Sequence, residues 1–223
     1  MSCKDIIKRL KSLANPKNVK GMARFGISSK NTLGVSIPVL RSIAREIGKD
    51  HKLALQLWDS GIHEARLLAC FIDDSSKVTE KQMDKWVKDI DSWDICDQLC
   101  SNLFGKTKFV HKKIFQWIKR EEEFVRRTGF VLIVALSIHD KKFDSFDEFF
   151  PLIKKYAIDE RNFVKKANNW TLRQIGKKNV KWNKKAIKLA KEIQKMDSKS
   201  AKWIASNALR ELTGEAVQKR LNA

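Results

Sequence analysis

The segment EEFVRRTG at residues 122–129 recurs, with the same apolar and basic positions, as RNFVKKAN at residues 161–168. A second pair of segments behaves in the same way, because NWTLRQ at 169–174 recurs as SNALRE at 206–211, and HEARLLACFI at 63–72 resembles an earlier copy. The copies stand roughly 30–40 residues apart, which is the length of a two-helix solenoid repeat. These matches therefore predict stacked helix pairs.

The rest of the chain agrees with a helical repeat. Only nine glycines and three prolines occur in 223 residues, and the long segments between them follow a 3.6-residue apolar period without strand-like alternation. No linker long enough to separate two domains is present. We predict an all-α fold, an α-α superhelical solenoid with a concave basic face, formed as a single domain of residues 1–223.

The balance of charge points to a polyanionic partner. Lysine and arginine number 46 against 26 acidic residues, a formal net charge of +20. Self-repulsion of that size opposes folding, so nucleic acid is the first partner to expect, the alternative being a surface that only confers solubility. The longest apolar run, FVLIVALSI at 130–138, is too short to span a membrane. With no secretory signal visible, we expect an intracellular monomer with reduced cysteines and no membrane contact.

Cationic and aromatic residues meet on the helix predicted over 161–175. At 100° per residue, Lys166 and Arg173 fall opposite a broad apolar arc, and Trp170 lies at the border between them. Such a tryptophan can contact a base or sugar while the cations hold phosphate. The alternative is a tryptophan that seals the edge of the core under lysine stems.

Two further candidates lie on neighbouring helices. Arg127 falls on an apolar flank of the helix predicted over 123–138, so it needs a carboxylate or phosphate partner, with Glu123 as a local alternative. In DSWDICDQLC at 91–100, Asp97 lies one turn beyond Trp93 at the edge of the apolar arc, whereas Asp94 points toward solvent. This setting can raise the pKa of the carboxylate or demand a cationic partner, but from these residues alone an interhelix salt bridge or a cap is the favoured role for Asp97.

No metal or cofactor is expected. Cys96 and Cys100 are spaced i, i+4 but have no third ligand nearby, so packing is their expected role. A glycine-rich phosphate loop is also missing from the sequence.

Taken together, these segments resemble the AlkD-like DNA alkylation repair family, DNA glycosylases built from HEAT-like repeats. The resemblance rests on the ordered series GMARFGI at 21–27, LGVSIPVLRSIAREI at 33–47, LWDSGIHEARLLA at 57–69, DSWDICDQLCSNLF at 91–104, EEFVRRTGF at 122–130, RNFVKKANNWTLRQIGKKN at 161–179 and DSKSAKWIASNALREL at 197–212. Each motif alone is weak, but together they span nearly the whole chain in order.

The resemblance implies roles for particular residues. The catalytic carboxylate falls on Asp97 and the active-site tryptophans on Trp93 and Trp170, with Arg127 near the phosphate of the lesion. The implied DNA contacts are Arg173, Lys166, Lys165, Arg126, Arg24 and Phe25. Phe25 departs from the family, some of whose members carry a tyrosine there.

The activity implied is excision of cationic N3- or N7-alkylated purines from duplex DNA, without a cofactor and without base flipping. Two other functions fit the same sequence. A non-catalytic DNA- or RNA-binding module needs the basic face but no carboxylate at Asp97, and a protein-interaction scaffold is disfavoured by the charge of +20.

Overall fold

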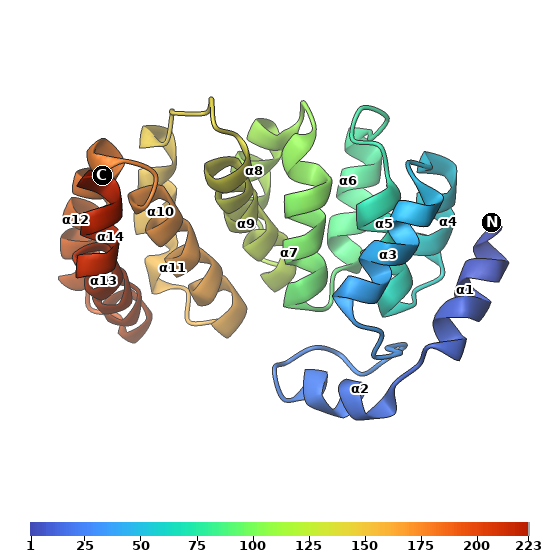
Figure 1. Ribbon diagram of the computed structural model, residues 1–223. Helices are drawn as coiled ribbons and strands as arrows, with labels where there is room; N and C mark the ends of the chain where they lie inside the picture. Colours follow the sequence, from blue (N-terminus) through green and yellow to red (C-terminus); the bar gives the residue numbers. More distant parts are fainter. Residues whose placement is uncertain (223) are drawn as a thin grey trace. The chain divides into compact units, whose positions relative to one another are not determined.

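All the regular elements that the computed structural model places in residues 1–222 are helices (Figure 1). Their contacts divide the chain into two compact units, Met1–His111 and Lys112–Ala223. The predicted single domain therefore stays a prediction, and we describe each unit by itself.

The first unit contains seven α-helices and two short 3₁₀ turns among its described residues. They are α1 (Cys3–Ser12), α2 (Pro16–Ala23), α3 (Ile37–Ile47), α4 (His51–Asp59), α5 (His63–Ile72), α6 (Glu80–Trp86), η1 (Val87–Asp89), α7 (Trp93–Asn102) and η2 (Phe104–Lys106). Helix α5 lies at the centre of the unit, because it packs against α3, α4 and α7.

Local sequence signals set where these helices begin. Ser2 and Asp5 form a reciprocal capping box at α1, and the Asn15 side chain caps α2, with Pro16 in its first turn. Each cap satisfies backbone N–H groups that a helix N-terminus leaves without a partner. Proline fits there because the N–H it lacks would have no helical acceptor.

A stacked tryptophan pair lies in the core of the first unit. The rings of Trp58 and Trp86 stack with centroids 4.1 Å apart and an angle of 1° between their planes, and both are buried. Trp58 Nε1 donates to the Asp89 carboxylate at 2.9 Å, so the one polar atom of this buried ring is satisfied.

The second unit continues with longer helices. Helix α8 (Val110–Ile118) spans the boundary, and α9 (Glu123–His139), η3 (Asp147–Phe149), α10 (Phe150–Lys155), η4 (Tyr156–Ile158), α11 (Asn162–Gly176), α12 (Val180–Gln194), α13 (Lys199–Leu212) and α14 (Glu215–Asn222) follow. Helix α9 packs against α11, and α11, α12 and α13 pack against one another.

Helix α9 is the centre of this unit. Every residue from Val125 to Leu136 is buried, as its nearly continuous apolar sequence predicts. Its glycine, Gly129, lies where α8 comes closest: a Cβ at this position would stand 2.6 Å from Ile118 Cγ1 and 2.8 Å from the Ile118 backbone nitrogen. Only a residue without a Cβ permits this approach.

The predicted all-α fold of stacked helix pairs is confirmed. The helices expected over 123–138 and 161–175 are α9 and α11, within one residue at each end.

Gly129→Ala should lower the free energy of unfolding by about 1–3 kcal/mol, because the added methyl group overpacks the contact between α8 and α9. The matched control is Gly21→Ala in α2, where a Cβ meets nothing within 4 Å, so stability should stay equal or rise by up to about 1 kcal/mol. Chemical denaturation of both variants measures the difference. Equal midpoints for the two would contradict the close approach at Gly129.

Candidate functional site

Helix α7 carries Trp93 and Asp97 at the edge of its buried face. Ile95, Cys96, Leu99 and Cys100 point into the core of the first unit and are fully buried, in agreement with the packing role expected for the two cysteines. Trp93 and Asp97 are partly exposed and lie one turn apart, so both border the same strip of surface. Asp97 is thus a carboxylate beside an indole ring at the margin of the core.

The turn after α2 is held against Trp93. Trp93 Nε1 donates to the backbone carbonyl of Phe25 at 2.9 Å, and the Phe25 side chain is 74% exposed. The bond uses the backbone, so it is independent of whether this position holds phenylalanine or tyrosine. The structure therefore brings Phe25 to Trp93 and leaves its ring, with the exposed Arg24 beside it in the chain, open to a ligand.

The buried carboxylate of Glu64 holds the loop between α2 and α3. Glu64, on α5, is fully buried and accepts from the backbone N–H groups of Leu33 at 2.8 Å, Gly34 at 2.6 Å and Val35 at 3.3 Å. Three charge-assisted hydrogen bonds compensate a carboxylate that would otherwise be costly to bury. Glu64 therefore ties α5 to the loop between α2 and α3, a role that sequence reasoning missed.

Asp94 does not point toward solvent, contrary to the prediction. Its carboxylate lies 2.8 Å from His63 Nε2, and the two side chains are 14% and 3% exposed. Burial favours the neutral imidazole, but the hydrogen bond and charge of Asp94 outweigh it and raise the pKa of His63. Burial likewise opposes the Asp94 carboxylate, yet its bond to His63 holds the pKa of Asp94 below its ordinary value. The partners lie 31 residues apart, so no local pattern indicates this pair.

In the second unit, Arg127 is buried at the junction of α9 and α11. It is 4% exposed, and its Nη1 donates to the Phe163 carbonyl at 2.9 Å. Glu123, the local partner considered from the sequence, accepts from the Phe163 backbone N–H at 3.3 Å. Glu123 and Arg127 thus hold the two backbone polar groups of one residue in the first turn of α11.

Arg126, the neighbour of Arg127, is engaged within the protein. Its Nε donates to the Ile118 carbonyl at 3.0 Å, Nη1 to Asp159 at 2.6 Å and Nη2 to Glu121 at 3.1 Å, and the residue is 7% exposed. Asp159 also pairs with Arg161 at 2.5 Å. Burial opposes the charge of Asp159, but these two cations keep its pKa below the ordinary value. We therefore expect no contact between Arg126 and DNA.

The outer face of α11 carries the predicted cations and tryptophan. Lys166 is exposed and Trp170 is partly exposed. Lys165 places Nζ 5.3 Å from the ring centroid of Trp203, which is 40% exposed on α13. Trp203 was missed from the sequence, because in the repeat it stands at the position of Lys166, seven residues before Arg210 as Lys166 is before Arg173.

Arg173 and Lys177 share one carboxylate. Arg173 Nη1 donates to Glu211, and Lys177 Nζ donates to the same carboxylate at 2.6 Å. Burial would raise the pKa of Glu211, but the bonds from Lys177 and Arg173 prevail and lower it. Two cations facing one anion leave a net positive charge, so this cluster can still attract phosphate. With the Gln174 amide turned to face its donors, its oxygen also accepts from Trp170 Nε1 at 2.9 Å, which fixes the indole on this face.

Residues 1–222 contain no group of three or more His, Cys, Asp or Glu side chains placed to hold a metal ion. Cys3, Cys70, Cys96 and Cys100 are free thiols. Within the same residues, none of the helices has both the length and the apolar character needed to cross a membrane.

The pair of His63 and Asp94 should stabilise the protein in a defined pH window. The raised pKa of His63 means that its contribution is complete below pH 6.5 and is lost as pH rises through the folded-state value. The lowered pKa of Asp94 means that its contribution is present above pH 3.8 and is lost as pH falls further. A double-mutant cycle of His63→Gln and Asp94→Asn should therefore give its largest coupling between these limits and a smaller one at pH 9. Coupling that does not change with pH would show that the pair is not ionised.

Comparison with known proteins agrees with this architecture. The sequence profile described as "DNA alkylation repair enzyme" matches residues 6–212. An uncharacterized protein of Listeria innocua serovar 6a is 26% identical over 197 residues, which cover 84% of each chain. A solved structure described as "A new family of proteins related to the HEAT-like repeat DNA glycosylases with affinity for branched DNA structures" aligns with a TM-score of 0.83 and 21% identity, over 99% of this chain and 96% of that one. The fold is thus that of the HEAT-like repeat proteins, and the chain belongs to the DNA alkylation repair enzyme family.

Proposed function

We propose that this protein is a monofunctional DNA glycosylase that hydrolyses the N-glycosidic bond of cationic N3- or N7-alkylated purines, such as 7-methylguanine and 3-methyladenine, in duplex DNA. The observation that carries the proposal is the placement of Asp97 one turn from Trp93 on α7, at the margin of the core and beside the Phe25 turn. Membership of the DNA alkylation repair enzyme family supports the reaction class.

The charge of the substrate explains why one carboxylate is enough. Glycoside cleavage commonly needs a second acid to protonate the leaving group. An alkylated purine already carries a positive charge, so the bond between C1′ and nitrogen breaks with its electron pair passing to the base, which leaves neutral. Asp94, the acid closest to Asp97 in sequence on α7, suits this scheme because His63 holds it as a carboxylate that has no proton to donate.

Asp97 stabilises the positive charge that develops on the sugar as the base leaves. A water molecule then forms the new bond to C1′, and Asp97 orients it and accepts its proton. The family resemblance assigns Trp93 and Trp170 to the sugar and backbone of the lesion nucleotide, and the negative π face of an indole favours positive charge. No lysine is assigned to form a covalent bond with the sugar. The proposed enzyme therefore hydrolyses the N-glycosidic bond and does not cleave the DNA strand.

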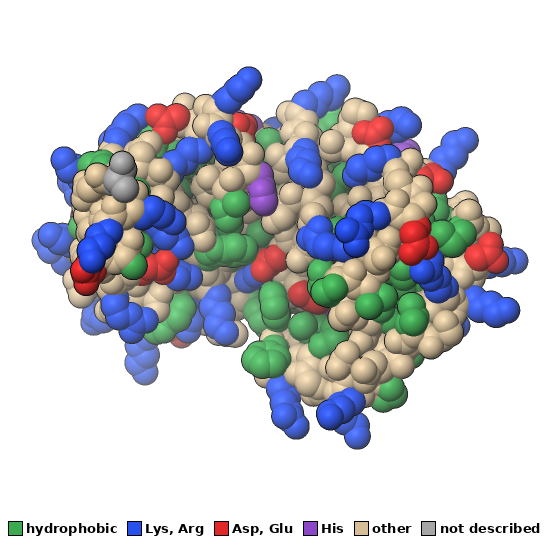
Figure 2. Space-filling model, viewed as in Figure 1, with side chains coloured by type: hydrophobic (Ala, Val, Ile, Leu, Met, Phe, Trp, Pro, Cys, Tyr) green, Lys and Arg blue, Asp and Glu red, His purple; other side chains and the backbone are tan. Residues whose placement is uncertain are grey.

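The DNA backbone is held by cations of both units. The family resemblance assigns Arg127 to the phosphate of the lesion, although its side chain is buried and bonded to Phe163. The solvent-facing side of α11 supplies Lys165, Lys166 and Arg173. In the first unit, Arg24 and Phe25 border Trp93. In the face of the molecule drawn in Figure 2, lysine and arginine side chains are spread over both units, which suits a long polyanion better than a small anionic ligand.

Asp97→Asn should abolish release of 7-methylguanine and 3-methyladenine from methylated duplex DNA. DNA affinity should stay equal or rise slightly, since a negative charge is removed from a surface that faces phosphate. The matched control is Asp91→Asn, which removes the same charge from an exposed position just before α7. Chromatography of released bases and fluorescence anisotropy on the same DNA provide the two measurements.

Excision by Asp97→Asn at the rate of the control would refute the assignment of Asp97. If the wild-type protein binds DNA tightly but releases no base, the alternative function, a non-catalytic DNA-binding module, gains support. Branched DNA should then be compared with linear duplex, because the solved neighbour is described as having affinity for branched structures.

A further inference from the structure

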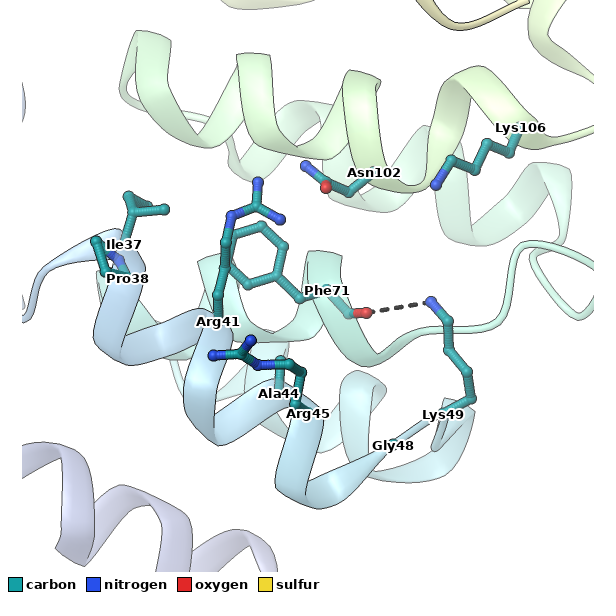
Figure 3. A pocket seen from close by; sticks show the side chains of 10 residues that line it. All are labelled: Ile37, Pro38, Arg41, Ala44, Arg45, Gly48, Lys49, Phe71, Asn102 and Lys106. Carbon is teal, nitrogen blue, oxygen red and sulfur yellow. Dashed lines mark hydrogen bonds between the residues drawn. The ribbon is translucent and has the colours of Figure 1, made fainter.

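A groove in the first unit lies outside all of the residues assigned so far. It has a volume of about 750 Å³ and lies among α3, α5, α7 and η2 (Figure 3). Ten residues line it: Ile37, Pro38, Arg41, Ala44, Arg45, Gly48, Lys49, Phe71, Asn102 and Lys106. We call it the basic groove, because four of these ten described residues are cationic and none is acidic.

The cations of the basic groove come from segments far apart in the chain. Arg41 and Arg45 stand one turn apart on α3, and Lys49 follows on the same side just after that helix ends. Lys106 reaches the groove from η2, 57 residues beyond Lys49. Figure 3 shows the ammonium groups of Lys49 and Lys106 on the same side of the groove. Burial lowers the pKa of Lys49, and the charge of Lys106 lowers it further. Like charges gathered in this way favour an anion between them.

Arg41 is positioned before any ligand binds. Its guanidinium carbon lies 4.5 Å from the ring centroid of Phe71, and its Nη2 donates to Gln98 at 3.1 Å. A guanidinium held over an aromatic ring and bonded to a second side chain has fewer orientations open to it, and its remaining N–H donors can meet phosphate oxygens.

The ammonium group of Lys49 is hydrogen-bonded within the protein. Its Nζ donates to the carbonyls of Phe71 at 3.1 Å and Asp73 at 2.5 Å, at the C-terminal end of α5, where the helix dipole favours a cation. Arg45 and Lys106 differ from it, because both are exposed and neither side chain has a hydrogen bond or ion pair to residues 1–222. The capacity to bind an anion therefore resides mainly in Arg41, Arg45 and Lys106.

The basic groove begins beside the candidate catalytic residue. Gln98, which holds Arg41, directly follows Asp97 on α7, and its side chain accepts from Asn102 Nδ2 at 3.0 Å. Asn102 lines the groove and comes five residues after Asp97, about 7.5 Å farther along the helix axis. A strand that meets Asp97 has neighbouring phosphates within a similar distance, since each strand of duplex DNA carries one charge per about 3.4 Å of the helix axis.

We propose that the basic groove binds the phosphodiester backbone of DNA and holds at least two consecutive phosphates next to the nucleotide that meets Trp93 and Asp97. The choice of DNA as the polymer rests on the proposed function. Arg45 and Lys106 contact phosphates directly, and Arg41 does so with its plane set by Phe71 and Gln98. The residue pattern fits a chain of spaced charges better than one compact anion, because the four cations are spread along a groove instead of converging on one point.

The test is the salt dependence of binding to unmodified duplex DNA, measured by fluorescence anisotropy between 50 and 200 mM salt. The variant Arg45→Ala/Lys106→Ala should lower the slope of log affinity against log salt by about 1.8, or about 0.9 for each phosphate that the protein no longer neutralises. The matched control is Lys52→Ala/Lys88→Ala, which removes two exposed lysines from α4 and η1 of the same unit and should change the slope much less. Equal slopes for the two double variants would overturn the proposal.

Inorganic phosphate distinguishes a compact anion site from a backbone site. In titration calorimetry with inorganic phosphate, we expect no saturable binding that depends on Arg45 and Lys106. The wild-type protein and Arg45→Ala/Lys106→Ala should therefore give the same titration curve. If phosphate does saturate such a site while the DNA slope is unchanged, the basic groove binds a small anion and the backbone proposal fails. The binding test uses DNA without lesions and needs no turnover. Normal excision by Asp97→Asn would therefore refute the role of Asp97 without changing the result for the groove. Equal salt slopes for the two double variants would refute the groove without changing the result for Asp97.

Discussion

The backbone of Phe163 is the point on which the second unit depends. Helix α9 presents Glu123 and Arg127, one turn apart, and these two side chains satisfy the N–H and the C=O of Phe163 in the first turn of α11. The first N–H groups of a helix have no partner within it, so the carboxylate fills a need that the helix itself creates. Because α9 is buried from Val125 to Leu136, it cannot shift without breaking its packing on every side. The bonds of Glu123 and Arg127 to Phe163 fix how α9 and α11 pack against each other. They also hold Arg127 in place for its proposed role.

The first unit solves a comparable problem with buried acids. Glu64 is fully buried and holds three N–H groups of the loop between α2 and α3, and the adjacent His63 holds Asp94 on α7. Gly34 of that loop has φ +79°, and a Cβ there would lie 2.3 Å from the Asn15 carbonyl oxygen, so only glycine fits. These contacts position the turn that meets Trp93 through its backbone. The surface around Asp97 is therefore supported by groups that need not touch a ligand.

Periodicity in the sequence was sufficient to predict the fold and the inward face of each helix. It identified α9 as buried, placed Ile95 and Leu99 in the core, and put Trp93 at its border. It could not identify the partner across an interface, because helical period tells which side is covered but not by what. Arg126 illustrates the limit: the repeat aligns it with Lys165 as a cation for DNA, yet it is closed by Asp159, 33 residues later. Asp94 was misplaced for the same reason, since His63 lies on another helix. The roles given to Asp97, Trp170 and Arg127 came from a family resemblance and stay proposals.

The formal charge of +20 overstates the charge available to a polyanion at any one place. Arg126 and Arg161 share Asp159, and Arg173 and Lys177 share Glu211. Cations paired in this way organise helix contacts first and add only their surplus to the surface field. Exposed cations without such partners, Lys166 on α11 and Arg45 and Lys106 in the basic groove, differ because an anion that binds them need not displace a carboxylate. Since releasing a partly buried ion pair costs more than meeting a solvated lysine, affinity for a backbone should follow the unpaired cations near it more closely than the total count.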